Sequence, residues 1–116
     1  MSNKEIFKDK VVILLSQQTD VKSNVIEIQD FVEKGKPFIP VFTSKEKMME
    51  STQGSELPFP KYKIEGLFLL GMMNGNEILR VNPGLKDEAY FIASDLKEEF
   101  LDDIEKLMKE VNSKNK

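Results

Sequence analysis

The residues that could carry catalysis are few in this chain, because its 116 residues include no cysteine and no histidine. Ser44 and Lys47 match S-x-x-K, the nucleophile pattern that lies at a helix start in serine acylases. Such enzymes also need a K-T-G strand and an S-D-N loop. The sequence contains no K-T-G, and Ser94-Asp95 is followed by Leu96. Helix capping accounts for Ser44, so we expect no catalytic residue.

Carboxylates are the remaining candidates for acid–base chemistry or for binding a hard cation. Five of them crowd one stretch near the C-terminus: Glu98, Glu99, Asp102, Asp103 and Glu105. They fall opposite an apolar stripe and are interleaved with Lys97, Lys106 and Lys109. This pattern is typical of a solvated helix face, so the sequence predicts no metal site and no cofactor.

The charge balance argues against nucleic acid as a partner. The 17 basic and 20 acidic residues give a formal net charge of -3, and Arg80 is the single arginine. A nucleic-acid module needs a basic face, and base readout favours the planar arginine fork. The phosphate-binding patterns G-x-G-x-x-G and G-x-x-x-x-G-K are also absent. We therefore expect no nucleic-acid binding.

Hydrophobic patterning indicates a globular chain. No apolar run approaches the length that crosses a bilayer, and no small-residue cleavage site follows the run Val11–Leu15. Hydrophobic residues make up 40% of the chain, enough for one core at this length. The absence of cysteine excludes disulfides. We expect one cytoplasmic domain over 1–116, with no membrane partner.

The first third of the chain predicts strands. Residues 1–10 are expected to form an arm or a short helix, and Val11–Leu15 a strand buried on both faces. After a polar loop at 17–24, the alternation over 25–31 predicts a half-buried strand. Gly35 then marks a turn in which a positive φ is tolerated.

A further strand and a capped helix follow this turn. Phe38–Phe42 is the strand, and Pro40 places it at an edge or turns the missing donor outward. Thr43 is the expected N-cap of a helix over 44–51, and Glu46 is expected to complete a capping box.

The segment 61–73 allows two interpretations. Tyr62 and Ile64 alternate as in a short strand, and the apolar run Gly66–Met73 favours a helix because it contains no β-branched residue. The alternative is one long strand that turns at Asn74-Gly75 into the next. We prefer the short strand followed by a helix.

The next strand, Ile78–Val81, ends at a turn. Pro83 is expected to hold Asn82 in an extended conformation, and Gly84 is expected to take a left-handed one. A last strand is predicted over Ala89–Ile92.

The clearest amphipathic pattern lies near the C-terminus. Ser94 or Asp95 is expected to cap a single helix, and a polar tail is expected over 112–116. The apolar stripe of this helix consists of Leu96, Phe100, Ile104, Leu107, Met108 and Val111. The chain thus predicts one α/β domain, with α+β as the alternative, built from a mixed sheet of about five strands and three helices.

Two segments are more specific than the rest. The stretch 38–46 is a strand that ends in P-V-F-T-S before a capped helix, and 78–84 is a strand that ends in N-P-G. This pair resembles the N-terminal domain of the SseB family, the bacterial "enhanced serine sensitivity" proteins. The resemblance covers roughly 11–100 and implies a small α/β sandwich. It supplies no catalytic residues, and the second domain of many relatives is not part of this sequence.

The two motifs supply the candidate binding residues, since strand ends of open α/β sheets tend to carry binding loops. They are Pro40, Phe42, Thr43, Ser44, Glu46, Asn82, Pro83 and Gly84. The leading hypothesis is a non-enzymatic binding module that recognises another protein. The alternatives are a small-ligand sensor with its pocket at these loops and, with less support, a carboxylate-based or metal-dependent enzyme. Turn chemistry and capping alone also explain both motifs.

Overall fold

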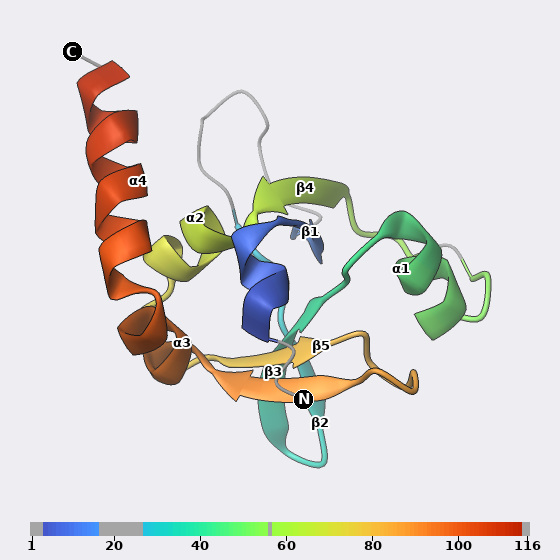
Figure 1. Ribbon diagram of the computed structural model, residues 1–116. Coiled ribbons are helices and arrows are strands. Elements are labelled where there is room, and N and C mark those ends of the chain that lie inside the picture. The colour runs from blue at the N-terminus through green and yellow to red at the C-terminus, as the bar shows by residue number, and fades with distance from the viewer. Residues whose placement is uncertain (1–3, 17–26, 56, 115–116) are drawn as a thin grey trace.

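The structure is a computed structural model that describes residues 4–16, 27–55 and 57–114 (Figure 1). The elements in chain order are η1 (Lys4–Lys8), β1 (Lys10–Leu14), β2 (Phe31–Glu33), β3 (Lys36–Val41), α1 (Lys45–Ser51), β4 (Lys61–Glu65), α2 (Gly66–Met72), β5 (Ile78–Val81), β6 (Ala89–Ile92), α3 (Ala93–Glu99) and α4 (Leu101–Lys114). This content confirms the α/β class. The described residues contain six strands and four α-helices, slightly more than expected.

The strands form two sheets. Four of them make a mixed sheet in the order β2-β3-β5-β6, in which β3 and β5 are parallel and the other neighbours are antiparallel. β1 and β4 form an antiparallel pair. Two backbone hydrogen bonds between Val12 and Phe42 join this pair to the end of β3. All of β1 after Lys10 is buried, as the sequence predicts.

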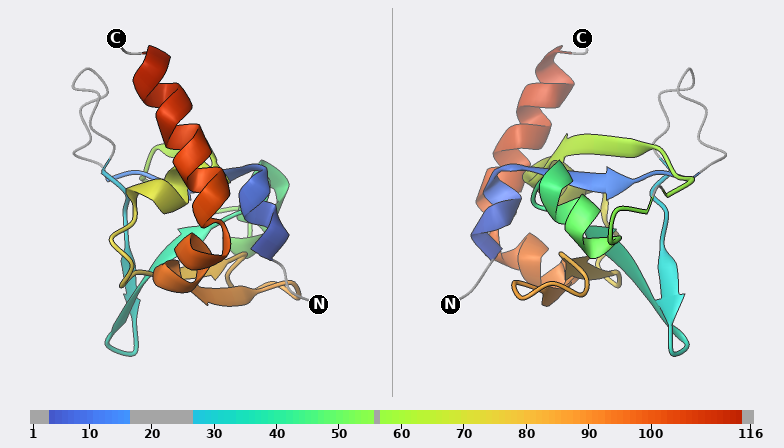
Figure 2. Two further views of the ribbon diagram at one scale, coloured as in Figure 1. Left: turned by 60° about the vertical axis from the view of Figure 1, so that its left-hand side comes forward. Right: turned by 90° about the vertical axis from the view of Figure 1, so that its right-hand side faces the viewer.

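The main core lies on one side of the four-stranded sheet. η1, α2 and the β1–β4 pair lie on that side, and α3 and α4 stand at one end of it (Figures 1 and 2). Leu79 and Val81 of β5 are buried in this core, whereas Ile78 and Arg80, which alternate with them, are only partly buried. Within the described residues, no helix packs over the face that carries Ile78 and Arg80, so one face of the sheet stays open.

Strand β2 is shorter and later than the sequence predicts. It begins at Phe31, and Ile28 makes only an isolated bridge to Leu15. Residues 25–26 and the loop at 17–24 lie outside the described residues. The turn after β2 is confirmed, because Lys34 and Gly35 have φ values of 53° and 79° and form a tight two-residue hairpin.

Pro40 lies in an interior strand and is buried, so the edge placement is wrong. The Val41 carbonyl accepts from Asn82 N–H on one side of β3, while Phe42 N–H donates to Val12 on the other side. Because backbone groups alternate along a strand, the Pro40 nitrogen points to the Val12 side. On that side, pairing with β2 reaches only as far as Phe38, which lies opposite Phe31, so β2 has no residue opposite Pro40.

The ambiguous segment 61–73 is a strand followed by a helix, as preferred. β4 ends at Glu65, and α2 begins at once with Gly66. A Cβ atom on Gly66 would lie 2.3 Å from the carbonyl oxygen of Phe7. The glycine therefore allows η1 to pack against the start of α2, and the Phe7 side chain is fully buried. The expected N-terminal arm is thus a short 3₁₀ helix anchored in the core.

The predicted C-terminal helix is two helices. α3 follows β6 directly, with no side-chain cap from Ser94 or Asp95, and α4 begins after Phe100. Phe100 leaves helical geometry with φ -108° and ψ 22°, yet its side chain is buried. The apolar spacing continues unchanged across this break, so the sequence pattern contains no sign of it. α4 also continues to Lys114, where a polar tail from 112 onward was expected.

Candidate functional site

The two sequence motifs meet in the structure. Because β3 and β5 are parallel neighbours, their C-terminal ends lie at the same edge of the sheet. The backbone N–H of Thr43 donates to Oδ1 of Asn82 at 3.1 Å, and Nδ2 of Asn82 donates to Oγ1 of Thr43 at 3.1 Å. Residues 39 positions apart are thus joined by a reciprocal pair of hydrogen bonds.

Asn82 adopts a left-handed conformation, with φ 47°, and the expectation of an extended residue is wrong. Asparagine tolerates this region better than most residues. Its side chain is 1% exposed, and Nδ2 also donates to Oδ2 of Asp87 at 3.1 Å. These three side-chain hydrogen bonds outweigh the preference that Pro83 imposes on the preceding residue. Gly84, at φ 79°, takes the left-handed turn that was expected.

The cap of α1 is Ser44, one residue after the predicted Thr43. Oγ of Ser44 accepts from the backbone N–H of Lys47 at 3.1 Å. The Thr43 hydroxyl is instead bound to Asn82. The Glu46 carboxylate is exposed and makes no hydrogen bond to a described residue, so the capping box does not form.

Further contacts close this region, which we call the loop junction and define as Thr43, Ser44, Lys47, Ser51, Asn82, Pro83 and Asp87. Nζ of Lys47 lies 3.3 Å from Oδ2 of Asp87, and the Ser51 hydroxyl donates to the Pro83 carbonyl. Oδ1 of Asp87 is buried and has no hydrogen-bond partner among the described residues. Of the predicted site residues, Pro40 and Phe42 are buried beneath the junction, and Glu46 and Gly84 are exposed at its rim.

A cavity of about 430 Å³ lies beside the first motif. It is lined by Lys10, Val12, Thr43, Ser44, Lys45, Glu46 and Lys63. Three of these residues are lysines, and Asn82 is not among them. The second motif therefore contributes nothing to this cavity.

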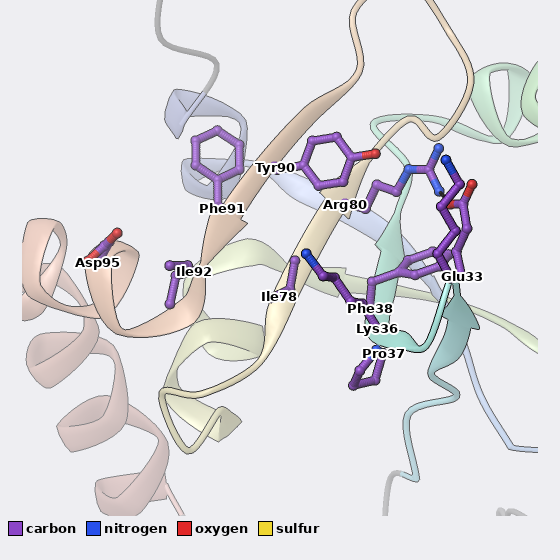
Figure 3. A pocket seen from close by; sticks show the side chains of 11 residues that line it. Glu33, Lys36, Pro37, Phe38, Ile78, Arg80, Tyr90, Phe91, Ile92 and Asp95 are labelled. Carbon is purple, nitrogen blue, oxygen red and sulfur yellow. Dashed lines mark hydrogen bonds and ion pairs between the residues drawn. The ribbon is translucent and has the colours of Figure 1, made fainter.

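A groove of about 650 Å³ occupies the open face of the four-stranded sheet (Figure 3). It is lined by Glu33, Lys34, Lys36, Pro37, Phe38, Ile78, Arg80, Tyr90, Phe91, Ile92 and Asp95, and we call it the sheet groove. The strand register pairs Ile78 with Ile92 and Arg80 with Tyr90. Tyr90 and Ile92 are 60% and 49% exposed, which is unusual for two neighbouring large side chains on one sheet face.

Arg80 organises one side of the sheet groove. Its guanidinium bonds to Glu33 and to Oε2 of Glu88, the latter at 2.8 Å. It also lies 5.1 Å from the ring centre of Phe38 and 5.4 Å from that of Tyr90. Only 15% of its side chain is exposed, so Arg80 already has its partners within the protein.

These contacts shift the ionisation of the pair. Burial alone would lower the pKa of Arg80, but the hydrogen bond and ion pair with Glu88 raise that pKa above its usual value. The pKa of Glu88 is lowered, first by the backbone N–H of Gly84, which donates to Oε2 at 2.6 Å, and then by Arg80. Both groups are therefore held in their charged forms.

The groove residues were not among the sequence candidates. The strands β5 and β6 were predicted with the correct bounds, and the one available signal was the alternation of Ile78 with Arg80 and of Tyr90 with Ile92. That signal shows that these side chains share a face, but not that the face is left open. Among the described residues, no group of three acidic side chains is arranged to hold a metal ion.

Within the described residues, no helix is long and apolar enough to cross a membrane. Comparison with protein-family models, with curated proteins and with solved structures found no match to this chain. The resemblance to the SseB family therefore stays a prediction.

Proposed function

We propose that this protein is a non-enzymatic binding module that recognises another protein through the sheet groove. The observation that carries this proposal is the exposure of Tyr90 and Ile92 beside Ile78 on a sheet face that no described helix covers. Apolar and aromatic side chains that remain uncovered in a monomer mark interaction sites more often than chance.

The composition of the groove supports a protein partner. Tyrosine, arginine and phenylalanine are enriched in protein interfaces, where a few of them contribute most of the binding energy. The Arg80 guanidinium lies close to the rings of both Phe38 and Tyr90, so the conformations of these side chains are restricted before a partner arrives. Less conformational entropy is then lost on binding.

An enzymatic role has less support. General acid–base catalysis at neutral pH needs a carboxyl group whose pKa is raised. Burial would raise the pKa of Glu77, but hydrogen bonds from the backbone N–H groups of Asn74 and Gly75 lower it overall. The pKa of Glu88 is lowered as well. Binding of nucleic acid is disfavoured because the guanidinium of Arg80 is already paired with Glu33 and Glu88. We also propose a cytoplasmic location.

The small-ligand sensor is a second candidate, and the cavity beside Thr43 and Ser44 is the observation that favours it. A ligand there would contact one predicted motif and three lysines. Its test is direct, because Lys63→Ala would weaken such a ligand and leave the sheet groove unchanged.

Co-purification from the cells that make the protein tests the proposal. Wild type is compared with a groove variant, Tyr90→Ala with Ile92→Ala, and with a matched control, Tyr62→Ala, which removes a tyrosine that is 40% exposed on β4. We expect partners that are retained by Tyr62→Ala and lost by the groove variant. Partners that the groove variant retains and Glu46→Arg loses would instead assign recognition to the motif loops.

A further inference from the structure

We propose that the occupant of the sheet groove is a segment of another protein in which apolar side chains are joined to an acidic residue. The apolar side chains lie on Phe38, Ile78 and Ile92, and the acidic residue lies at the β2–β3 hairpin. This inference rests on the proposed function and names the chemistry of its partner.

Two unpaired cations support the acidic end. Lys34 and Lys36 line the groove, and neither makes an ion pair within the described residues. Lys36 reaches toward Ile78, over the apolar floor of the groove (Figure 3). Lys36 is exposed, but a partner segment that covers the apolar floor would partly shield its own carboxylate and this ammonium from water, which strengthens the charge pair.

Several other cations on the molecule have partners, while lysines such as Lys45 and Lys63 beside the other cavity also make no ion pair within the described residues. Arg80 contacts Glu33 and Glu88, and Lys47 contacts Asp87. Elsewhere, Lys4 and Lys8 pair with Glu99 and Glu5, and Lys97 donates to the Met73 carbonyl. The groove thus contains two cations that are available to an incoming group next to one that is not.

The hairpin holds these lysines in place. Lys34 and Gly35 form a two-residue turn with positive φ at both positions, the geometry that matches the twist of the flanking strands. Lys36 is the first residue of β3 and lies opposite Glu33 in the register of β2 and β3. The lysine backbones are therefore fixed relative to the groove.

The far end of the groove has the opposite charge. Asp95, at the start of α3, lies across the groove from Lys36 and Glu33 (Figure 3). Between these ends the floor is apolar, with Phe38 and Ile78 partly buried and Ile92 half exposed. This charge order favours a partner segment that runs from an acidic residue at the hairpin, across apolar residues, to a neutral or basic residue near Asp95.

Selection of phage-displayed random linear peptides tests this chemistry. The full chain is immobilised as wild type, as the groove variant Tyr90→Ala with Ile92→Ala, and as the charge swap Lys34→Glu with Lys36→Glu. The control is Lys63→Glu, which makes one such charge reversal beside the other cavity. We expect wild type and Lys63→Glu to enrich peptides that combine aromatic or aliphatic residues with Asp or Glu. The charge swap should instead enrich peptides in which Lys or Arg takes the place of the Asp or Glu.

A selected peptide is then synthesised with a fluorophore, and its affinity is measured by fluorescence polarisation. Lys36→Glu should weaken it by about tenfold or more, whereas Lys63→Glu should change it by less than about twofold. If peptides depend on Tyr90 and Ile92 but carry no acidic preference, this inference is overturned and the proposed function stands. If selection yields no peptide that depends on Tyr90 and Ile92, both are overturned.

Discussion

The loop junction and the sheet groove share the two parallel strands β3 and β5. The junction lies at the C-terminal ends of these strands, and the groove lies on the open face, where β6 also contributes. At the loop junction, Asn82 is 1% exposed and its amide makes three hydrogen bonds to Thr43 and Asp87. In the sheet groove, Tyr90 is 60% exposed and Lys36 has no ion-pair partner among the described residues.

This difference separates two uses of polar residues. A buried amide whose hydrogen bonds are satisfied internally stabilises the fold and offers little to a partner. An exposed aromatic residue next to an unpaired ammonium contributes little to the fold and can contribute to binding. The most conspicuous sequence motif thus connects two loops, while the residues suited to recognition lie in an ordinary strand pattern.

The largest expected effect is at the apolar base of the loop junction. Phe42 is 2% exposed and packs with Val12, Leu14 and Met48. Phe42→Ala should lower the free energy of unfolding by about 3–5 kcal/mol, because it leaves a cavity in a packed cluster. Urea denaturation measures this. A loss below about 1 kcal/mol would mean that the two motifs do not rest on a rigid base.

Asn82→Ala should cost about 2–3 kcal/mol, since it leaves the Thr43 N–H without its acceptor and places alanine at a positive φ. Asn82→Gly separates the two causes, because glycine accepts this conformation but forms no side-chain bond. We expect Asn82→Gly to be more stable than Asn82→Ala but less stable than wild type. Equal stability of Asn82→Ala and wild type in thermal melts would contradict the role assigned to the amide.

Ser44→Ala should cost about 1 kcal/mol, because the backbone N–H of Lys47 loses its side-chain acceptor at the start of α1. Glu46→Ala is the matched control two residues away and should stay within about 0.5 kcal/mol, since its carboxylate makes no hydrogen bond to a described residue. If Ser44→Ala and Glu46→Ala lose the same free energy of unfolding in chemical denaturation, Glu46 contributes to the cap, as the capping box predicted from the sequence requires.

The ion pair beneath the sheet groove predicts a pH dependence. Because the folded-state pKa of Glu88 lies below its usual value of 4.5, its contribution to stability is present above that pH and is lost as pH falls through the lowered pKa. The difference in unfolding free energy between wild type and Glu88→Gln should therefore be constant near neutral pH and shrink in acid. A difference that does not change with pH would contradict the assigned charge state.

The smallest effect on stability is expected in the sheet groove itself. Tyr90→Ala with Ile92→Ala should change the free energy of unfolding by no more than about 1 kcal/mol, because about half or more of each residue is exposed and Tyr90 loses only its contacts with Arg80 and Glu88. Differential scanning calorimetry measures this change. A loss as large as that of Asn82→Ala would make the groove a part of the core.

Much of the fold was accessible from the sequence because local patterns specify it. The strands at Ile78–Val81 and Ala89–Ile92 and the strand–helix order of 61–73 follow from β-branched residues, turn residues and helix propensity. The break at Phe100 was not accessible, since the apolar spacing continues through it. The left-handed Asn82 depends on a partner 39 residues away, which no local pattern contains.

The candidate site was only partly predictable for a related reason. The two motifs meet because their strands pair in parallel. Which of their polar atoms are hydrogen-bonded at the junction can be seen only in the three-dimensional structure. The groove depends on which sheet face the helices leave open. Period-two alternation assigns Ile78, Arg80, Tyr90 and Ile92 to one face and cannot say whether a helix covers it.

Site-specific photo-crosslinking tests most directly whether the partner binds in the sheet groove. It locates the partner on the surface without changing the charge of the groove. A benzophenone amino acid is placed in living cells at position 90 in the sheet groove, at position 46 on the rim of the loop junction, or at position 62 on β4. We expect a cross-linked partner from position 90 and none from positions 46 and 62. Cross-linking from position 46 without cross-linking from position 90 would contradict the account and assign recognition to the loop junction.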